Sequence, residues 1–279
     1  MVCLDNAKLI GNGTSSCFLI EQDRLLFYKT DGTDLVSMIR RWSDPLSLYL
    51  LSMIPFKRHV SAVRNRSKLI EKEVRTLQLW KDEGIEVPEL IDYSDSAITY
   101  AFIDNSRSYK EELGQQNHGD AFELFLELYD RIRKAAKRHR NPDILHSDPH
   151  LDNFLCVYGQ NGQKKAIPID PELILNPRMS FEDIDTNLLV DTLVSISGLK
   201  TSEENRERYI RGFKQLMTEE DIGRITSLDY SVPPAAMHYF RLREEFAYRI
   251  KGREKRRPLA KITDFIEYYE TRLKGILLE

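Results

Sequence analysis

A short stretch of the chain, residues 144–157, concentrates polar groups between two apolar runs. It contains His146, Asp148, His150, Asp152 and Asn153. Imidazole and carboxylate groups bind metal ions, exchange protons and hold phosphate-bound magnesium. Three explanations are therefore open for this stretch: a metal site, a site of phosphoryl transfer, or a polar loop without a special role.

The metal explanation depends on His146 and His150, which are four positions apart. On a helix that spacing would put both imidazoles on one face, as in zinc hydrolases. Pro149 lies between them, however, and proline removes a backbone donor and moves the preceding Asp148 away from helical geometry. The residue after His146 is Ser147 and not the glutamate of the zinc pattern. The sequence therefore disfavours a zinc site.

The phosphoryl-transfer explanation depends on His146, Asp148 and Asn153, which have the spacing of a kinase catalytic loop. In such a loop the carboxylate, here Asp148, points at the acceptor hydroxyl. The amide oxygen, here that of Asn153, reaches a magnesium ion on the phosphates. Asp170 follows at the end of another apolar segment and can hold magnesium between the phosphates. This order of residues predicts ATP and Mg²⁺ as cofactors.

A kinase catalytic loop requires further parts upstream, and the sequence has a candidate for each. Gly11 and Gly13 lie between two predicted strands and could cover the phosphates. Lys29 ends the third predicted strand, and Glu73 lies on the following predicted helix, where it could pair with that lysine. Each residue alone is unremarkable, and it is their joint occurrence in this order that favours a kinase.

Five segments in the first 105 residues predict strands. Residues 7–11, 16–22 and 24–30 are apolar and aromatic and follow one another closely, which predicts an antiparallel meander. Two more strands are expected at 87–94 and 97–104, with a turn at Asp95 between them.

The helix predicted between these strands begins with Ser67 as its cap and ends at Gly84. Ile70, Val74 and Leu77 form its apolar stripe.

The second half of the chain has a different character. Residues 119–139 form a strongly amphipathic helix pattern, and Phe122, Phe125, Leu126 and Tyr129 share its apolar face. Residues 164–175 predict a strand, and mainly helical sequence follows to the end. The expected fold class is therefore α+β, with a small β-rich lobe at 1–105 and a larger, mainly α-helical lobe at 106–279.

Composition excludes several classes of protein. The chain has 279 residues, 41% hydrophobic and 30% charged, with a net charge of −3, which fits a soluble globular protein and does not favour a nucleic-acid partner. Its three cysteines, Cys3, Cys17 and Cys156, have no paired spacing, so a reduced, cytoplasmic compartment is expected.

Two features raise the question of a membrane surface. The apolar stretch 45–56 is about half the ~20 residues that a membrane span needs, so it is either a core helix or a segment that lies on a membrane surface. The basic segments 56–68 and 250–257 are either solvated faces or docking sites for an anionic surface or substrate.

The sequence LHSDPHLDNFL, with IDPE after it, resembles the protein-kinase-like small-molecule phosphotransferases. That superfamily includes aminoglycoside phosphotransferases, methylthioribose and fructosamine kinases, and lipopolysaccharide core kinases. Residues 71–94 are similar to their glutamate-bearing helix and its Gly-x-x-x-Pro entry to the next strand. Asp148-Pro149-His150 followed by Asn153-Phe154 looks most similar to the heptose and Kdo kinases of the lipopolysaccharide core.

The resemblance implies a bilobal protein-kinase-like fold, with an ATP-binding lobe at 1–105 and a catalytic and acceptor-binding lobe at 106–279. It implies that Asp148 deprotonates the acceptor and that Asn153 and Asp170 bind magnesium. Lys29 would hold the α- and β-phosphates and be positioned by Glu73. Gly11 and Gly13 would let the backbone approach the phosphates.

The resemblance also implies contacts around these groups. The connection near Tyr100–Ile103, including Tyr100 and Phe102, would meet the adenine through its backbone. His146 would brace the catalytic loop, and either Asp183 or Asp185 would tie that loop down.

The sequence also departs from eukaryotic protein kinases. Ser147 replaces their arginine, Asp170-Pro171-Glu172 replaces Asp-Phe-Gly, and no Ala-Pro-Glu element follows. A protein kinase regulated by an activation loop is therefore disfavoured. Glu172 is either a further metal or substrate group or a surface glutamate.

The implied activity is transfer of the γ-phosphoryl group of ATP to a hydroxyl of a sugar or sugar-like acceptor. A lipopolysaccharide core sugar at the inner face of a membrane is the leading candidate, with peripheral contact to anionic lipid. A soluble metabolite or aminoglycoside-type kinase, and a pseudokinase that only binds, are the alternatives.

Overall fold

The structure is a computed structural model. It describes residues 7–12, 15–21, 25–31, 59–61, 65–115, 119–171, 173–234, 236–239 and 258–279. The apolar stretch 45–56, the basic segment 250–257 and, within the basic segment 56–68, residues 56–58 and 62–64 lie outside the described residues. None of the helices in the described part combines the length and apolar character that crossing a bilayer requires.

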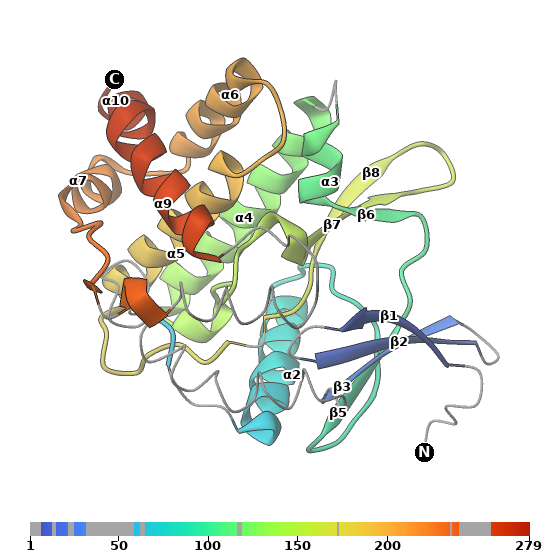
Figure 1. The fold of residues 1–279 in the computed structure, drawn as a ribbon. Coiled ribbons are helices and arrows are strands. Elements are labelled where there is room, and N and C mark those ends of the chain that lie inside the picture. Colours follow the sequence, from blue (N-terminus) through green and yellow to red (C-terminus); the bar gives the residue numbers. More distant parts are fainter. Residues whose placement is uncertain are drawn as a thin grey trace.

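The first half of the chain forms a five-stranded antiparallel sheet in the order β1-β2-β3-β5-β4 (Figure 1). Its strands are β1 (Ala7–Asn12), β2 (Ser15–Glu21), β3 (Leu25–Asp31), β4 (Leu90–Tyr93) and β5 (Ala97–Ala101). All five predicted strands are confirmed, as is the meander of the first three. Leu26 on β3 and Ile98 on β5 are buried.

Helix α2 (Arg66–Asp82) lies between this sheet and the helical part of the molecule (Figure 1). The predicted cap at Ser67 is wrong, because the helix starts earlier and the side chain of Asn65 accepts from the Lys68 backbone N–H at 3.4 Å. Asparagine and serine are equally good caps, so residue type could not choose between them. Gly84 follows the helix with φ of 70°, a conformation that favours glycine.

The second half of the chain combines a three-stranded antiparallel sheet with many helices, and it confirms the α+β class. The sheet has the order β6-β7-β8, from Ser106–Ser108, Phe154–Tyr158 and Lys164–Pro168. The strand predicted at 164–175 therefore ends at Pro168, and Leu175 instead forms an isolated bridge with Val60.

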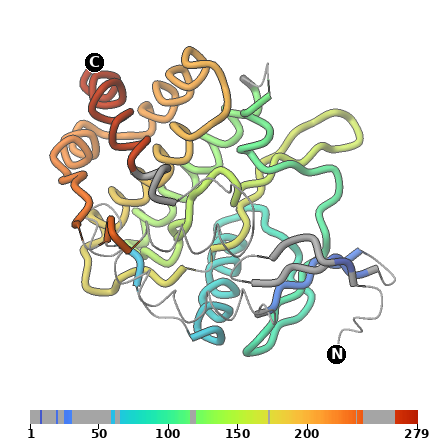
Figure 2. The backbone as a smooth tube through the Cα atoms, viewed as in Figure 1, coloured from blue at the N-terminus to red at the C-terminus, as the bar shows by residue number. Residues whose placement is uncertain are grey.

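The helices of this half follow the sequence from green to red in Figure 2. They are α3 (Tyr109–Gly114), α4 (Gly119–His139), α5 (Phe181–Ser197), α6 (Glu203–Lys214), α7 (Glu219–Ser227), α9 (Pro258–Tyr268) and α10 (Lys274–Leu278), with 3₁₀ turns η2 (Pro142–Ile144) and η3 (Leu151–Asn153) and a π-helical turn η4 (Tyr269–Leu273).

The apolar face of α4 forms the centre of the core, as its pattern predicts. Phe122, Phe125, Leu126 and Tyr129 are all buried. The ring of Phe125 meets that of Phe154 edge-on at 5.1 Å, a favourable arrangement for aromatic pairs. Because Phe154 begins β7 directly after Asn153, this contact anchors the downstream end of the polar stretch.

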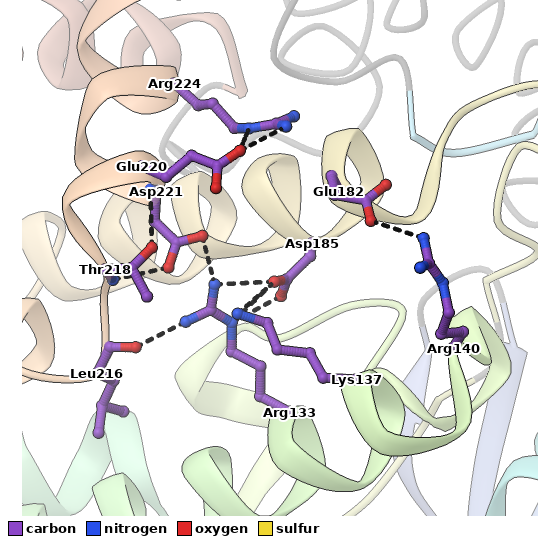
Figure 3. Close-up of polar contacts among 10 residues, drawn as sticks. All are labelled: Arg133, Lys137, Arg140, Glu182, Asp185, Leu216, Thr218, Glu220, Asp221 and Arg224. Carbon is purple, nitrogen blue, oxygen red and sulfur yellow. Dashed lines mark hydrogen bonds and ion pairs between the residues drawn. The ribbon is translucent and has the colours of Figure 1, made fainter.

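A buried ion cluster joins three helices of the helical part (Figure 3). The guanidinium of Arg133 on α4 donates to Asp185 on α5 at 2.8 and 2.9 Å, and its Nη2 lies 2.7 Å from Asp221 on α7. Its Nη1 donates to the carbonyl of Leu216 at 2.6 Å. Burial alone would lower the pKa of Arg133, but the two carboxylates raise it above its ordinary value, so the cluster stays charged.

We expect Arg133→Met to lower the free energy of unfolding by about 3–5 kcal/mol, because it leaves two buried carboxylates without their main cation. Arg224→Met is the matched control, since Arg224 pairs with Glu220 at the surface, where solvent screens the pair, so its loss should change the free energy of unfolding little. Urea denaturation measures both changes. Equal losses for the two variants would contradict a special role for the buried cluster.

Candidate active site

Within the stretch 144–157, residues 145–153 form a loop that is held at both ends. Before it, the side chain of Asn141 caps the 3₁₀ turn η2 by accepting from the Asp143 N–H at 3.0 Å. After it, η3 ends at Asn153 and β7 starts on the buried ring of Phe154. Pro149, between these ends, is buried as well.

His146 braces this loop from inside, which confirms the expectation for it. Its Nε2 lies 2.9 Å from the carbonyl of Ile169 and 3.4 Å from that of Asn153. Carbonyls only accept, so Nε2 carries the proton and Nδ1 is free to accept the Asp148 N–H at 3.3 Å. Burial between the rings of Trp80 and Phe154 lowers the pKa of His146 to about 4, so the ring is neutral near pH 7.

Asp148 and Asn153 contact each other directly. The Nδ2 of Asn153 donates to the backbone carbonyl of Asp148 at 2.9 Å and to its Oδ2 at 3.0 Å. These bonds use the donor side of the amide, so its Oδ1 remains an acceptor. The other carboxylate oxygen of Asp148 lies 3.3 Å from Nε2 of His150. Asp148 is half-buried, which leaves it accessible to a ligand.

Lys29, Glu73 and Asp170 form a second group, and they come from three separate elements. The Nζ of Lys29, on β3, lies 3.4 Å from Oε2 of Glu73 on α2 and is also ion-paired with Asp170, just after β8. Lys29 and Glu73 are buried, whereas the side chain of Asp170 is 38% exposed. Tyr100 donates its hydroxyl to the other oxygen of Glu73 at 2.6 Å.

A backbone bond joins the two groups. The Ile169 N–H donates to the carbonyl of Asn153 at 2.9 Å, so Asp170 follows directly on a residue tied to the loop. Asp170 itself has φ of 60°, in the left-handed region that non-glycine residues seldom adopt. Such backbone strain concentrates at functional sites. The structure thus brings Lys29, Glu73, Asp148, Asn153 and Asp170 into one connected polar network.

The remaining candidates lie as follows. Gly11 is in β1 opposite Cys17, next to a register shift, whereas Gly13 and Glu172 lie outside the described residues. Tyr100 lies in β5 with its side chain toward Glu73. The N–H of Phe102 already donates to the carbonyl of Leu25 at 3.0 Å, so a ligand at Phe102 would meet its carbonyl.

The expected tie between Asp183 or Asp185 and the catalytic loop is wrong for the part of the chain that the structure describes. Asp185 points at Arg133 and Lys137 (Figure 3). Asp183 contacts Ser180 and Arg224. Spacing along α5 did not reveal which of its faces turns toward the loop.

Two hydroxyls of α5 hold the loop instead, and the sequence analysis missed both. Ser195 Oγ accepts the Leu151 N–H at 2.9 Å, and Thr192 Oγ1 lies 3.4 Å from the Pro149 carbonyl. Hydroxyls within a helix commonly bond the helix's own carbonyls, as Thr192 also does with Leu188 at 3.0 Å. Residue type therefore carried no signal for this role.

We expect the depressed pKa of His146 to appear in the pH dependence of stability. Between its ordinary pKa of 6.5 and about 4, the unfolded chain takes up a proton that the native ring refuses. Native stability therefore falls as the pH drops through this window. His146→Gln keeps a donor and an acceptor but cannot titrate, so its free energy of unfolding should fall less between pH 7 and pH 5 in urea denaturation. The same pH dependence in both proteins would argue against a buried neutral His146.

Comparison with known proteins supports the fold. No protein-family model and no curated protein matches the chain. A choline/ethanolamine kinase family protein from Mesorhizobium loti has a similar structure, with a TM-score of 0.52 and 12% identity over 98% of this chain and 90% of that one. WaaP in complex with acyl carrier protein gives a TM-score of 0.45 at 11% identity, covering 86% of this chain and 88% of its own. Choline kinase LicA from Streptococcus pneumoniae gives a TM-score of 0.39 at 12% identity, over 98% of this chain and 93% of that one. The chain has a protein-kinase-like fold, with a small antiparallel sheet and a mostly helical remainder.

Proposed function

We propose that the chain is an ATP-dependent kinase that transfers the γ-phosphoryl group to an alcohol hydroxyl. The observation that carries this proposal is the network itself. Lys29 is ion-paired with Glu73 and Asp170. Ile169, the residue before Asp170, donates its N–H to the carbonyl of Asn153, whose side chain bonds Asp148. Catalysis of phosphoryl transfer requires positioning and charge neutralisation more than covalent chemistry, and a rigid network of this kind supplies both.

The proposed roles follow from the position of each group. Asp148 is half-buried and held by Asn153, and it accepts the proton of the acceptor hydroxyl. The hydroxyl oxygen forms a bond to the γ-phosphorus while the bond from that phosphorus to the ADP oxygen breaks. Lys29 holds the α- and β-phosphates, and Glu73 fixes its ammonium group. Gly11 and Gly13 cover the phosphates, and the backbone near Tyr100 and Phe102 binds the adenine.

Asn153 and Asp170 are the proposed magnesium ligands, and their chemistry fits that ion. Both offer hard oxygen donors, and Mg²⁺ needs only one or two protein ligands beside phosphate oxygens and water. The donor side of the Asn153 amide is occupied by Asp148, so its oxygen is the group left for a cation. A bound Mg²⁺ would neutralise phosphate charge, and Asp170 would then exchange its pairing with Lys29 for the metal.

The same assignment divides the chain into two proposed lobes. Residues 1–105 would bind ATP, and residues 106–279 would carry the catalytic loop and bind the acceptor. In the described part of the chain, the five-stranded sheet and α2 supply Lys29 and Glu73, and the remainder supplies Asp148, Asn153 and Asp170.

The acceptor is proposed at two levels. The Mesorhizobium loti structure is described as a choline/ethanolamine kinase family protein, and choline and ethanolamine are alcohols, which supports a small alcohol as acceptor. The finer proposal, a lipopolysaccharide core sugar phosphorylated at the cytoplasmic face of a membrane, rests on the sequence around Asp148 and Asn153 and on the basic segments.

A panel of acceptors separates the finer proposal from its rivals. ATP consumption would be measured with lipopolysaccharide core fragments, free sugars, aminoglycosides, choline and ethanolamine. Turnover confined to core fragments, with binding to anionic liposomes, supports the membrane-surface kinase. Turnover on a free metabolite or aminoglycoside without lipid would instead support a soluble kinase. Absence of Mg·ATP binding would contradict the proposal that the protein is an enzyme.

We expect Asp148→Ala to lower kcat by about 10²–10⁴-fold while Mg·ATP binding is retained, because the variant loses the proton acceptor but keeps the phosphate-binding groups. Calorimetry measures binding, and coupled ADP release measures turnover. Asp152→Ala is the matched control: it lies in the same loop, and its exposed carboxylate pairs with Lys110 at the surface. Comparable kcat losses in both variants would speak against Asp148 as the base.

A further inference from the structure

A buried lysine lies next to the Glu73 of the proposed site. Lys72 is 4% exposed, yet its ammonium group has three oxygen partners. Its Nζ donates to Thr76 Oγ1 at 2.9 Å and to the carbonyl of Asp143 at 3.1 Å, and it pairs with Asp143 Oδ1 at 3.0 Å. An ammonium group has three hydrogens, so these contacts satisfy it fully. Burial lowers the pKa of Lys72, and the neighbouring Asp143 opposes that shift.

This contact is part of the interface between α2 and η2, which we call the seam and which is formed by Lys72, Thr76 and Trp80 on α2 and by Asp143 and Ile144 on η2. Lys72, Thr76 and Trp80 are spaced by four residues, so they lie on one face of the helix. Thr76 Oγ1 bonds the Asp143 carbonyl at 3.1 Å, and Trp80 Nε1 donates to the carbonyl of Ile144 at 2.7 Å. All three side chains therefore meet the same short turn.

The turn η2 leads directly into the catalytic loop. Asp143 and Ile144 come just before His146, whose ring also packs against Trp80 with centroids 5.3 Å apart. The seam thus fastens α2 to the start of the loop that carries Asp148. Glu73, the residue of α2 that follows Lys72, reaches Lys29 at 3.4 Å, near the outer limit of a hydrogen bond, so a rotation of the helix would weaken that contact.

We propose that Lys72 is a positioning residue of the kinase: by binding Asp143 it fixes the rotation of α2 and so keeps Glu73 within reach of Lys29. This inference rests on the proposed function, since it assigns Lys72 a role through the phosphate-binding lysine. It also gives η2 the role of holding α2 in place through Asp143.

A purely structural role for Lys72 makes a different prediction. Removing one partner of an ion pair destabilises the fold strongly when the charge left behind is buried and unpaired. That does not apply to Lys72→Met, because the side chain of Asp143 is 29% exposed. Asp143 keeps a second cation, because Arg75 Nη2 lies 2.6 Å from its other oxygen. Stability and nucleotide affinity can therefore be separated in one variant.

The test uses Lys72→Met, with Arg75→Met as the matched control. Both residues lie on α2 and pair with Asp143, but the side chain of Arg75 is 62% exposed. Calorimetry with Mg·ADP and with a non-hydrolysable Mg·ATP analogue measures affinity, and thermal unfolding confirms that each variant is folded. We expect Lys72→Met to weaken the affinity by about tenfold to a hundredfold, because small misplacements of positioning groups have effects of that size. Arg75→Met should stay within about twofold.

A double-mutant cycle with Glu73→Gln tests whether Lys72 acts through Glu73. If it does, adding Lys72→Met to Glu73→Gln should change the affinity by less than about twofold. Additive losses would overturn the inference. Should Lys72→Met fail to fold, Asp143→Asn provides the same test, because it keeps the side-chain shape and removes the charge.

The outcomes separate this inference from the kinase assignment. Wild-type protein that binds neither nucleotide would overturn the kinase proposal and the role of Lys72 with it. Wild-type binding with unchanged affinity in both Lys72→Met and Asp143→Asn would overturn the inference alone.

Discussion

The buried ammonium group of Lys29 is the constraint around which the small sheet, α2 and the catalytic loop are arranged. A cation removed from water is tolerated only where carboxylates replace its hydration. Its two carboxylates come from α2 and from the segment after β8, so neither local sequence nor one element can satisfy it. The fold has to bring three distant segments together at one point. Tyr100, from a strand beside β3, then fixes the far oxygen of Glu73.

The polar groups beyond Lys29 are held mostly by hydrogen bonds to backbone groups, so the loop has fixed partners before any ligand binds. His146 ties the loop to Ile169, Ile169 ties itself to Asn153, and α5 holds Leu151 through Ser195. Because these contacts already position the groups in the folded protein, less conformational entropy has to be lost during phosphoryl transfer. The left-handed backbone of Asp170 fits the same logic, since local strain persists only where its surroundings over-determine it.

The parts that sequence could predict are those that depend on periodicity and order. The strands, α4 and the stripe of α2 follow from the spacing of apolar residues, and the pairing of Lys29 with Glu73 follows from the order of the motif. The parts that sequence missed depend on how helices are rotated against their neighbours. Asp185 turns to Arg133, Ser195 turns to the loop and Lys72 turns to Asp143, and spacing along a single helix specifies none of these choices. The cap of α2 is Asn65 and not the predicted Ser67, and residue type could not distinguish them because asparagine and serine are equally good caps.

Among the residues that the structure describes, Arg133 and Lys29 are each a buried cation between two carboxylates, and the differences between these two clusters help to decide which of them is functional. Around Arg133 the guanidinium and both carboxylates are almost fully enclosed, and the cation cannot lose its proton. Such a cluster fastens helices together and leaves a ligand no access. Around Lys29 one carboxylate, Asp170, is substantially exposed and has a strained backbone. A strained, accessible carboxylate beside a buried ammonium can exchange partners when an anion and a cation arrive together, which is how Mg·ATP would bind. We therefore expect the cluster around Lys29 to take part in the reaction and the cluster around Arg133 to stabilise the fold, although each has one cation between two carboxylates.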